Sequence, residues 1–161
     1  MSINEELQLG RPMEDFRHEA VLNIVRTSNL LSQKGALLFR HFDLTEAQFN
    51  VLFVLRHKER MLTQSDLGKR LLVTRASVTS VLDKLEKKGL IKRSVVHGNR
   101  RIYHVDLTPK GLELIDQVEP RYRKNIHVVL EDFDEGACRR LIADIEKIRA
   151  RCHALDAADF T

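Results

Sequence analysis

Apolar residues recur at helical spacing along most of this chain. The first such pattern predicts a long helix over residues 12–40, with Pro12 tolerated at its first position. A break follows, and Thr45 then predicts the start of a second helix. Gln48 stands three residues after Thr45, which is the spacing of a capping box.

Two shorter helical patterns come next. Thr63 is placed to cap the first, with Asp66 in its first turn. After a turn at residues 72–73, Thr74 is placed to cap a longer helix that Gly89 ends as a C-cap. The apolar stripe of this longer helix consists of Val78, Val81, Leu82 and Leu85.

The pattern then changes to short β-rich runs. Residues 90–96 and 102–107 flank the turn-like residues 97–100, which predicts a β-hairpin. Thr108 and Pro109 cap and open another helix, in which Pro120 predicts either a kink or two abutting helices. Two helices followed by a hairpin are typical of a winged helix-turn-helix, which places one helix in a DNA major groove.

A last helix is predicted from about Asp134. Its apolar residues step by three and four in the manner of a heptad seam, and they are Cys138, Leu141, Ile145, Ile148, Cys152 and Leu155. Such a seam on a terminal helix favours contact with a second copy about a two-fold axis, and an intramolecular groove is the alternative. The fold class predicted is mainly α with a small β-wing, in a single domain over residues 1–161. Within it, a winged helix-turn-helix lobe spans 45–108 and dimerisation helices span 12–40 and 109–156.

The net charge of +4 is unevenly placed along the chain. Between Met61 and Arg101, ten lysines and arginines stand against three acidic residues, so the rest of the chain is mildly acidic. A basic segment of this kind indicates a protein that holds a polyanion. No apolar run is long enough to span a bilayer, and the polar N-terminus does not resemble a signal peptide. We therefore expect a cytoplasmic protein without a membrane partner.

The longer helix of the pair is the candidate for reading DNA bases. When Val78 faces inward, a step of 100° per residue turns small and hydroxylic side chains outward in the N-terminal half and lysines outward in the C-terminal half. Arg75 is the long donor best placed for a guanine contact. The preceding helix offers Gln64 and Ser65 to a phosphate, and arginines at the hairpin tip suit a minor groove. The complete candidate set is Gln64, Ser65, Thr74, Arg75, Ala76, Ser77, Thr79, Ser80, Lys84, Lys87, Asn99, Arg100 and Arg101.

The chain resembles the MarR family of bacterial transcription regulators over nearly its whole length. The resemblance is carried by LTEAQFNVL at residues 44–52, by the helix-turn-helix over 63–91, and by NRRIYHVDLTPKG at residues 99–111. The last motif is the most specific, although Asn99 stands where such families carry an acidic residue. What the resemblance implies is an obligate two-fold dimer that reads a pseudo-palindromic operator. It also implies a wing-orienting pair between Asp83 and Arg101, with Arg100 free to probe the groove.

Members of this family commonly sense a small molecule, a metal ion or an oxidant. For an aromatic or organic acid, the resemblance points to the crevice between the dimer helices and the DNA-binding lobe, where the candidate polar groups are Asn23, Arg26, His41 and His57. Cys138 and Cys152 lie about 21 Å apart on one helix, so we expect them to pack, with a disulfide across the dimer as the other possibility. The histidines do not cluster at metal-ligand spacing. We expect neither a metal nor a cofactor.

Two other classes of function are alternatives to a regulator. An enzyme is disfavoured, since the chain has no glycine-rich phosphate loop, no nucleophile elbow and no metal-helix motif. A winged helix without ligand response, acting as a non-specific DNA architect or a protein-interaction module, is the alternative. The function predicted is a sequence-specific dimeric repressor of nearby genes that a small-molecule effector relieves.

Overall fold

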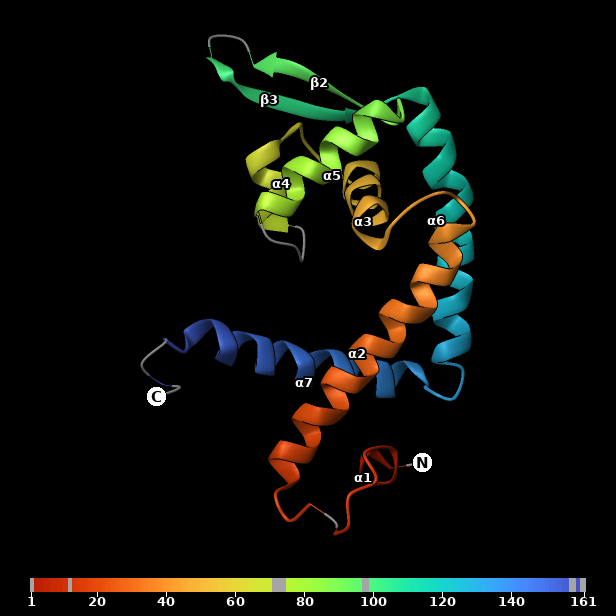
Figure 1. The fold of residues 1–161 in the computed structure, drawn as a ribbon, viewed down its shortest axis with the longest axis vertical. Coiled ribbons are helices and arrows are strands. Elements are labelled where there is room, and N and C mark those ends of the chain that lie inside the picture. The colour runs from red at the N-terminus through yellow and green to blue at the C-terminus, as the bar shows by residue number, and fades with distance from the viewer. Residues whose placement is uncertain (1, 12, 71–74, 97–98, 157–158, 160–161) are drawn as a thin grey trace. The chain divides into compact units, whose positions relative to one another are not determined.

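The computed structural model describes residues 2–11, 13–70, 75–96, 99–156 and 159. Helices dominate the described chain, and a small sheet accompanies them (Figure 1). In order along the chain, the elements are α1 (Ile3–Glu6), α2 (Phe16–Arg40), α3 (Glu46–Arg56), β1 (Leu62–Thr63), α4 (Gln64–Arg70), α5 (Arg75–Lys87), β2 (Ile91–Val96), β3 (Asn99–Leu107), α6 (Pro109–Val129) and α7 (Glu135–Ala154). Two compact units, residues 1–122 and 123–161, are each described by themselves.

The N-terminal region departs from the sequence prediction. The long helix α2 begins at Phe16 rather than at Pro12, which lies outside the described residues. Asp15 is its N-cap, because the carboxylate accepts hydrogen bonds from the backbone N–H groups of Arg17 at 2.9 Å and His18 at 3.4 Å. The side-chain cap at Asp15 sets the start of the helix, whereas proline is only tolerated at a first helical position and does not by itself start a helix. The short helix α1 was not predicted.

Three capping predictions are confirmed in the first unit. Thr45 and Gln48 form a reciprocal capping box, with N···O distances of 3.0 and 3.2 Å. Thr108 caps α6 by accepting from the backbone N–H of Gly111 at 3.1 Å. Gly89 ends α5 in a left-handed conformation at φ 69°, and the paired bonds from Gly89 N to Glu86 O and from Leu90 N to Leu85 O form a Schellman motif. These local bonds fix where α5 ends.

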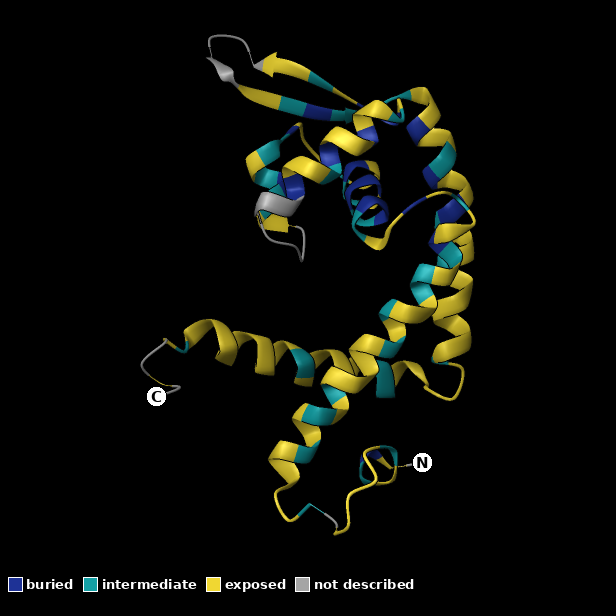
Figure 2. Ribbon diagram, viewed as in Figure 1, coloured by how far each residue is buried: buried dark blue, intermediate teal, exposed yellow. Residues whose placement is uncertain are grey.

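The core of the first unit lies beneath the helix-turn-helix (Figure 2). The predicted stripe of α5 is confirmed, since Val78, Leu82 and Leu85 are buried and Val81 is half-buried. These side chains pack with the buried face of α3 and with the first half of α6. The buried members from those two helices are Phe49, Val51, Leu52, Leu55, Ile115 and Val118. Burial on this scale stabilises the lobe mainly through the hydrophobic effect.

The end of α5 and the start of α6 meet in one tight junction. Three consecutive carbonyl groups after α5 each accept a hydrogen bond from residues 108–110. The donors are Lys110 Nζ to Lys88 O at 2.9 Å, Thr108 Oγ1 to Gly89 O at 2.7 Å, and Thr108 N to Leu90 O at 3.1 Å. Gly111 is buried against this junction, and a Cβ added there would lie 1.9 Å from Leu90 O. Only glycine permits this approach of the two backbones.

The sheet is antiparallel, with strand order β1-β3-β2. Ile91 pairs with Leu107 at its base, and the register shifts between Val95 and Val96. The prediction that Asn99 and Arg100 belong to the turn is wrong, because β3 begins at Asn99, which pairs with Val96. Pairing across the hairpin extends the strand over residues that resemble a turn when read alone. Residues 97–98 lie outside the described chain.

The last two helices confirm one prediction and correct another. α6 continues through Pro120 as one helix, so the expectation of two abutting helices is wrong. Asp134 caps α7 as expected, with its Oδ1 accepting from the backbone N–H of Ala137 at 2.6 Å. None of the residues of α7, all of which the structure describes, is buried within the chain.

Candidate nucleic-acid interface

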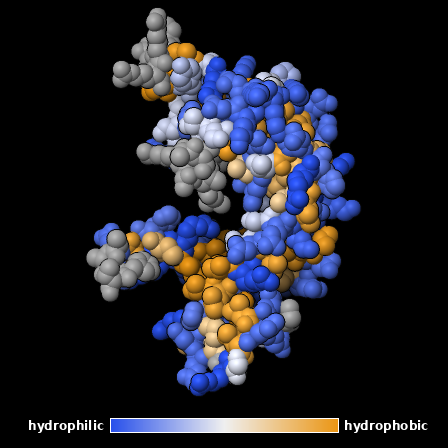
Figure 3. All heavy atoms as spheres, in the orientation of Figure 1, coloured by the Kyte–Doolittle hydropathy of each residue, from blue (hydrophilic) through white to orange (hydrophobic). Residues whose placement is uncertain are grey.

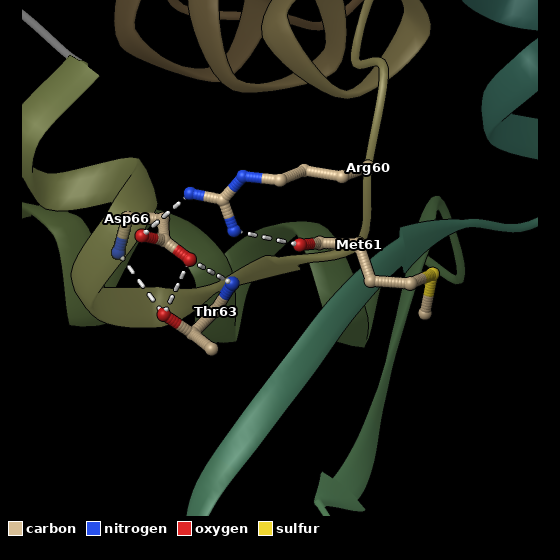
Figure 4. A network of polar contacts seen from close by, with 4 residues as sticks. All are labelled: Arg60, Met61, Thr63 and Asp66. Carbon is tan, nitrogen blue, oxygen red and sulfur yellow. Dashed lines mark hydrogen bonds and ion pairs between the residues drawn. The ribbon is translucent and has the colours of Figure 1, made fainter.

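A compact polar network holds the turn that leads into α4 (Figure 4). The backbone N–H and the hydroxyl of Thr63 donate to Asp66 Oδ2 at 3.0 and 2.9 Å, while Asp66 N donates to Thr63 Oγ1 at 3.1 Å. Arg60 Nη2 lies 3.4 Å from the other carboxylate oxygen. The hydrogen bonds from Thr63, assisted by Arg60, lower the pKa of Asp66 to about 2. The start of α4 is therefore fixed by an ionised carboxylate.

This network predicts a pH dependence of stability. The pKa of Asp66 falls from 3.8 in an unfolded chain to about 2 in the folded one, so its contribution is complete above pH 4 and is lost as pH falls towards 2. Asp66→Asn should therefore flatten the fall in unfolding free energy between pH 4 and 2, measured by urea denaturation at each pH. Asp132→Asn, which removes an exposed carboxylate outside the network, should retain the wild-type slope. Equal slopes for Asp66→Asn and the wild type would contradict the prediction.

The predicted phosphate-contacting residues of α4 lie beside α5. Gln64 Nε2 donates to Thr79 Oγ1 of α5 at 2.7 Å, so two residues of the candidate DNA-binding set are hydrogen-bonded to each other. Ser65 is exposed. The side chains that the helical projection turned outward on α5 are exposed wherever they are described, namely Thr79, Ser80, Asp83, Lys84 and Lys87. The arrangement therefore presents a hydroxylic and cationic surface opposite a buried apolar stripe.

Several predicted contacts fall outside the described side chains. Thr74 lies outside the described residues, so its capping role stays a prediction. The backbone of α5 includes the first-turn residues Arg75, Ala76 and Ser77, and β3 includes Asn99, Arg100 and Arg101. These backbone positions place the residues at the start of α5 and at the tip of the wing. Their side-chain roles stay predictions.

Asp83 makes an ion pair that the sequence analysis missed. Its Oδ1 accepts from Arg93 Nη2 of β2. The backbone N–H of Arg93 also donates to Glu86 Oε1 at 3.1 Å, and Arg93 Nε lies 3.5 Å from Glu86 Oε2 outside hydrogen-bond alignment. The predicted partner Arg101 has no described side chain, so that pairing stays a prediction. The available signal for Arg93 was strand alternation, which places it on the same face as buried Ile91.

The Arg93 contacts change the electrostatics of α5. Both acidic side chains in the second half of α5, Asp83 and Glu86, lie against one guanidinium that is only 18% exposed. Lys84 and Lys87 have no carboxylate partner among the described residues. The outward face of α5 therefore presents cationic groups while its carboxylates are compensated by the wing. Such a surface suits a phosphate backbone.

The four candidate ligand-binding residues do not come together within the chain. Asn23 Nδ2 donates to Glu19 O on its own helix at 2.9 Å, and Arg26 Nε donates to Glu6 Oε2 at 2.6 Å. His41 is the C-cap of α2, about 20 Å along the helix from Arg26. His57 Nε2 lies 2.8 Å from Glu119 Oε2. The side chains of Asn23, Arg26 and His57 thus have partners of their own, and the ligand-binding role of the four residues stays a prediction.

The seam residues of the second unit are accessible. Cys138, Ile145 and Leu155 are half-buried, and Leu141, Ile148 and Cys152 are exposed. Leu155 is the C-cap of α7 rather than part of the helix. Both cysteines are free thiols. Within the described part of the chain, no three metal-ligating side chains cluster, and no helix combines the length and apolar character required to cross a membrane.

Comparison with known proteins agrees with this geometry. A profile of the MarR family matches residues 44–103. The transcriptional repressor MprA of Escherichia coli is 32% identical, over 89% of this chain and 88% of the relative. The HTH-type transcriptional regulator PecS of Dickeya dadantii is 28% identical, over 85% of this chain and 86% of the relative. The crystal structure of the Staphylococcus aureus MepR–DNA complex superposes with a TM-score of 0.74 at 26% identity, covering 80% of this chain and 94% of MepR.

These matches cover the helix-turn-helix, the wing and most of the flanking helices. The relatives are transcriptional regulators rather than enzymes, and the surface built by α4, α5 and the wing suits duplex DNA. The chain therefore belongs to the MarR family of DNA-binding transcriptional regulators.

Proposed function

We propose that this regulator is a sequence-specific homodimer that represses nearby genes and that a small-molecule effector releases from its operator. The observation that carries the proposal is the exposed face of α5, where Thr79 and Ser80 precede Lys84 and Lys87 opposite a buried stripe. Small hydroxyl groups allow the helix to approach base edges, whereas lysines bind phosphates. Two of the matched relatives, MprA and YetL of Bacillus subtilis, are named repressors, which supports the sign of regulation.

Exposed apolar side chains support the dimer. Many of them lie on α2, where Figure 3 shows an orange surface. Those on α2 include Phe16, Val21, Val25, Leu31 and Leu37. Within the second unit, Leu141, Ile142 and Ile148 of α7 are exposed as well. Apolar surface of this extent on a monomer is typical of a protein–protein interface. A second copy of the chain is the partner that a two-fold DNA reader requires.

A hollow beside the recognition helix offers a place for the effector. It has a volume of about 500 Å³ and lies between α4, α5 and β3. Its lining combines the largely apolar side chains Val78, Ile102 and Tyr103 with the polar residues Thr63 and Gln64, so the aromatic ring is the part of an acid that this hollow suits. An effector bound there would release the operator by favouring the protein conformation that does not fit it.

The experiment is selection of bound fragments from randomised duplexes, followed by footprinting with excess random competitor at physiological salt. Ser80→Ala should relax sequence preference, whereas Lys87→Gln should keep the preference and lower the slope of log affinity against log salt by about 1. The matched control Lys124→Gln, on the exposed surface of α6, should change neither. The complex should contain two chains per duplex, and salicylate as a probe acid should weaken it.

The alternative functions predict different results. A non-specific architect would lose its footprint under competitor, and a protein-interaction module would give none. If Ser80→Ala and Lys87→Gln behave alike, α5 does not read the bases. One chain per duplex would exclude the homodimer.

A further inference from the structure

A second hollow, of about 600 Å³, lies apart from the one beside the wing. It is formed where α2 ends, α3 begins and the last turns of α5 pass. Its lining residues are Arg40, Asp43, Leu44, Thr45, Gln48, Lys84, Lys87 and Lys88. Four of these side chains are cationic and one is anionic, so the lining carries a net charge of +3.

Internal contacts neutralise only one of the four cations. Lys88 Nζ lies 3.0 Å from Asp43 Oδ2 and also donates to the backbone carbonyl of Asp43. Arg40 Nε donates to Ala36 O at 3.3 Å, within its own helix, which leaves the two Nη groups available. Among the described residues, no carboxylate pairs with Arg40, Lys84 or Lys87. Like charges held around one hollow repel each other unless an anion joins them.

The lining also restricts the class of anion. Leu44 is the only large apolar side chain in it and is itself buried, so an aromatic acid would gain little contact. In their capping box, Gln48 Oε1 accepts from Thr45 N and Thr45 Oγ1 accepts from Gln48 N, so these two side chains add only neutral donors to the lining. The charged donors are one guanidinium fork and the ammonium groups, a combination that binds phosphate and clustered carboxylates.

We propose that this hollow binds a small polyanion with two or more charges, a diphosphate or a polycarboxylate, and that the bound anion competes with DNA. The competition rests on the proposed function, because Lys84 and Lys87 belong to the surface assigned to the phosphate backbone. A polyanion between Arg40 and these lysines removes their charge from the DNA-facing side. This makes the hollow an inhibitory site separate from the aromatic-acid site.

The test is calorimetric titration of the full-length protein with inorganic pyrophosphate at constant ionic strength. Wild-type protein should bind one pyrophosphate per chain, and Arg40→Gln should weaken binding about tenfold, as expected for loss of a bidentate charged contact. Arg40→Lys should recover part of the affinity. Lys34→Gln is the matched control, because it removes one exposed cation from the same helix outside the hollow, and it should bind as the wild type does.

A displacement experiment tests whether the hollow is occupied by a free polyanion or by a phosphate group of the DNA. Pyrophosphate should displace a selected duplex from the wild type and from Lys34→Gln, and displacement from Arg40→Gln should need about tenfold more. The proposal is overturned if wild-type protein does not bind pyrophosphate, or if Lys34→Gln weakens binding as much as Arg40→Gln. It is also overturned if Arg40→Gln weakens only DNA binding, which would assign the hollow to the DNA backbone. The titration needs no DNA, so the anion site and the proposed function can fail independently.

Discussion

Gly111→Ala should destabilise the protein by about 3 kcal/mol, near the upper end of the usual cost of overpacking. The added Cβ would lie 1.9 Å from Leu90 O and 2.9 Å from Leu90 C. Both obstructing atoms belong to the backbone, so a side-chain rotation cannot relieve the clash. Relief requires α6 to separate from the end of α5, which breaks the hydrogen bonds of Thr108 and Lys110 to the last carbonyl groups. Urea denaturation at one fixed protein concentration measures the effect.

Gly136→Ala is the matched control for Gly111→Ala. Gly136 also lies in the first turn of a helix, but a Cβ there would meet the end of the flexible Arg140 side chain at 3.3 Å. Alanine has the higher helix propensity, so this variant should be neutral or stabilised by up to about 1 kcal/mol. A Gly111→Ala protein as stable as the wild type would show that the two helices do not approach so closely.

Arg93→Gln should weaken DNA binding by about tenfold to a hundredfold, although Arg93 itself is not proposed to contact DNA. Without the guanidinium, Asp83 and Glu86 become uncompensated carboxylates on α5, the helix that we propose faces the phosphates. Their repulsion from DNA is added to the loss of rigidity between α5 and β2. A difference of about 1.4 kcal/mol corresponds to each factor of ten. Fluorescence anisotropy with a selected duplex, repeated across salt concentrations, measures the change.

Lys92→Gln provides an equal change of charge on the neighbouring residue of the same strand. Lys92 is exposed and pairs in register with Asp106, away from the carboxylates of α5. Its loss should weaken DNA binding by only a few-fold, as for any distant surface charge. If both variants lose the same affinity, the effect of Arg93 is one of net charge. A larger loss for Arg93→Gln that Asp83→Asn partly restores would identify the ion pair as the cause.

Helix ends were predictable from sequence where one side chain makes the cap. Thr45, Thr63, Thr108 and Asp134 each accept from a backbone N–H group three residues further on, so the signal is contained in a short stretch. The inward stripe of α5 was predictable for the same reason, since helical geometry converts sequence spacing directly into direction. These local features, together with the hairpin, were sufficient to indicate the winged helix-turn-helix.

Features that depend on distant residues were not predictable in this way. The Arg93 contacts join β2 to α5, and Gly111 lies against the backbone of Leu90. The spacing of apolar residues in the sequence does not indicate either contact. Asn99 resembles a turn residue until its pairing with Val96 draws it into β3. Tertiary pairing decides all of these cases.

The wing leaves and rejoins the helical scaffold at a single place. The bond from Thr108 N to Leu90 O closes residues 91–107 into a loop, just outside the pair formed by Ile91 and Leu107. The flanking helices meet through this closure and through Gly111, so their mutual geometry does not depend on how far the hairpin extends. The base of the hairpin belongs to the scaffold, because Ile91 and Val105 lie in the core. Its outer part can therefore change in length and tip chemistry to suit a different groove while α5 stays anchored to the same frame.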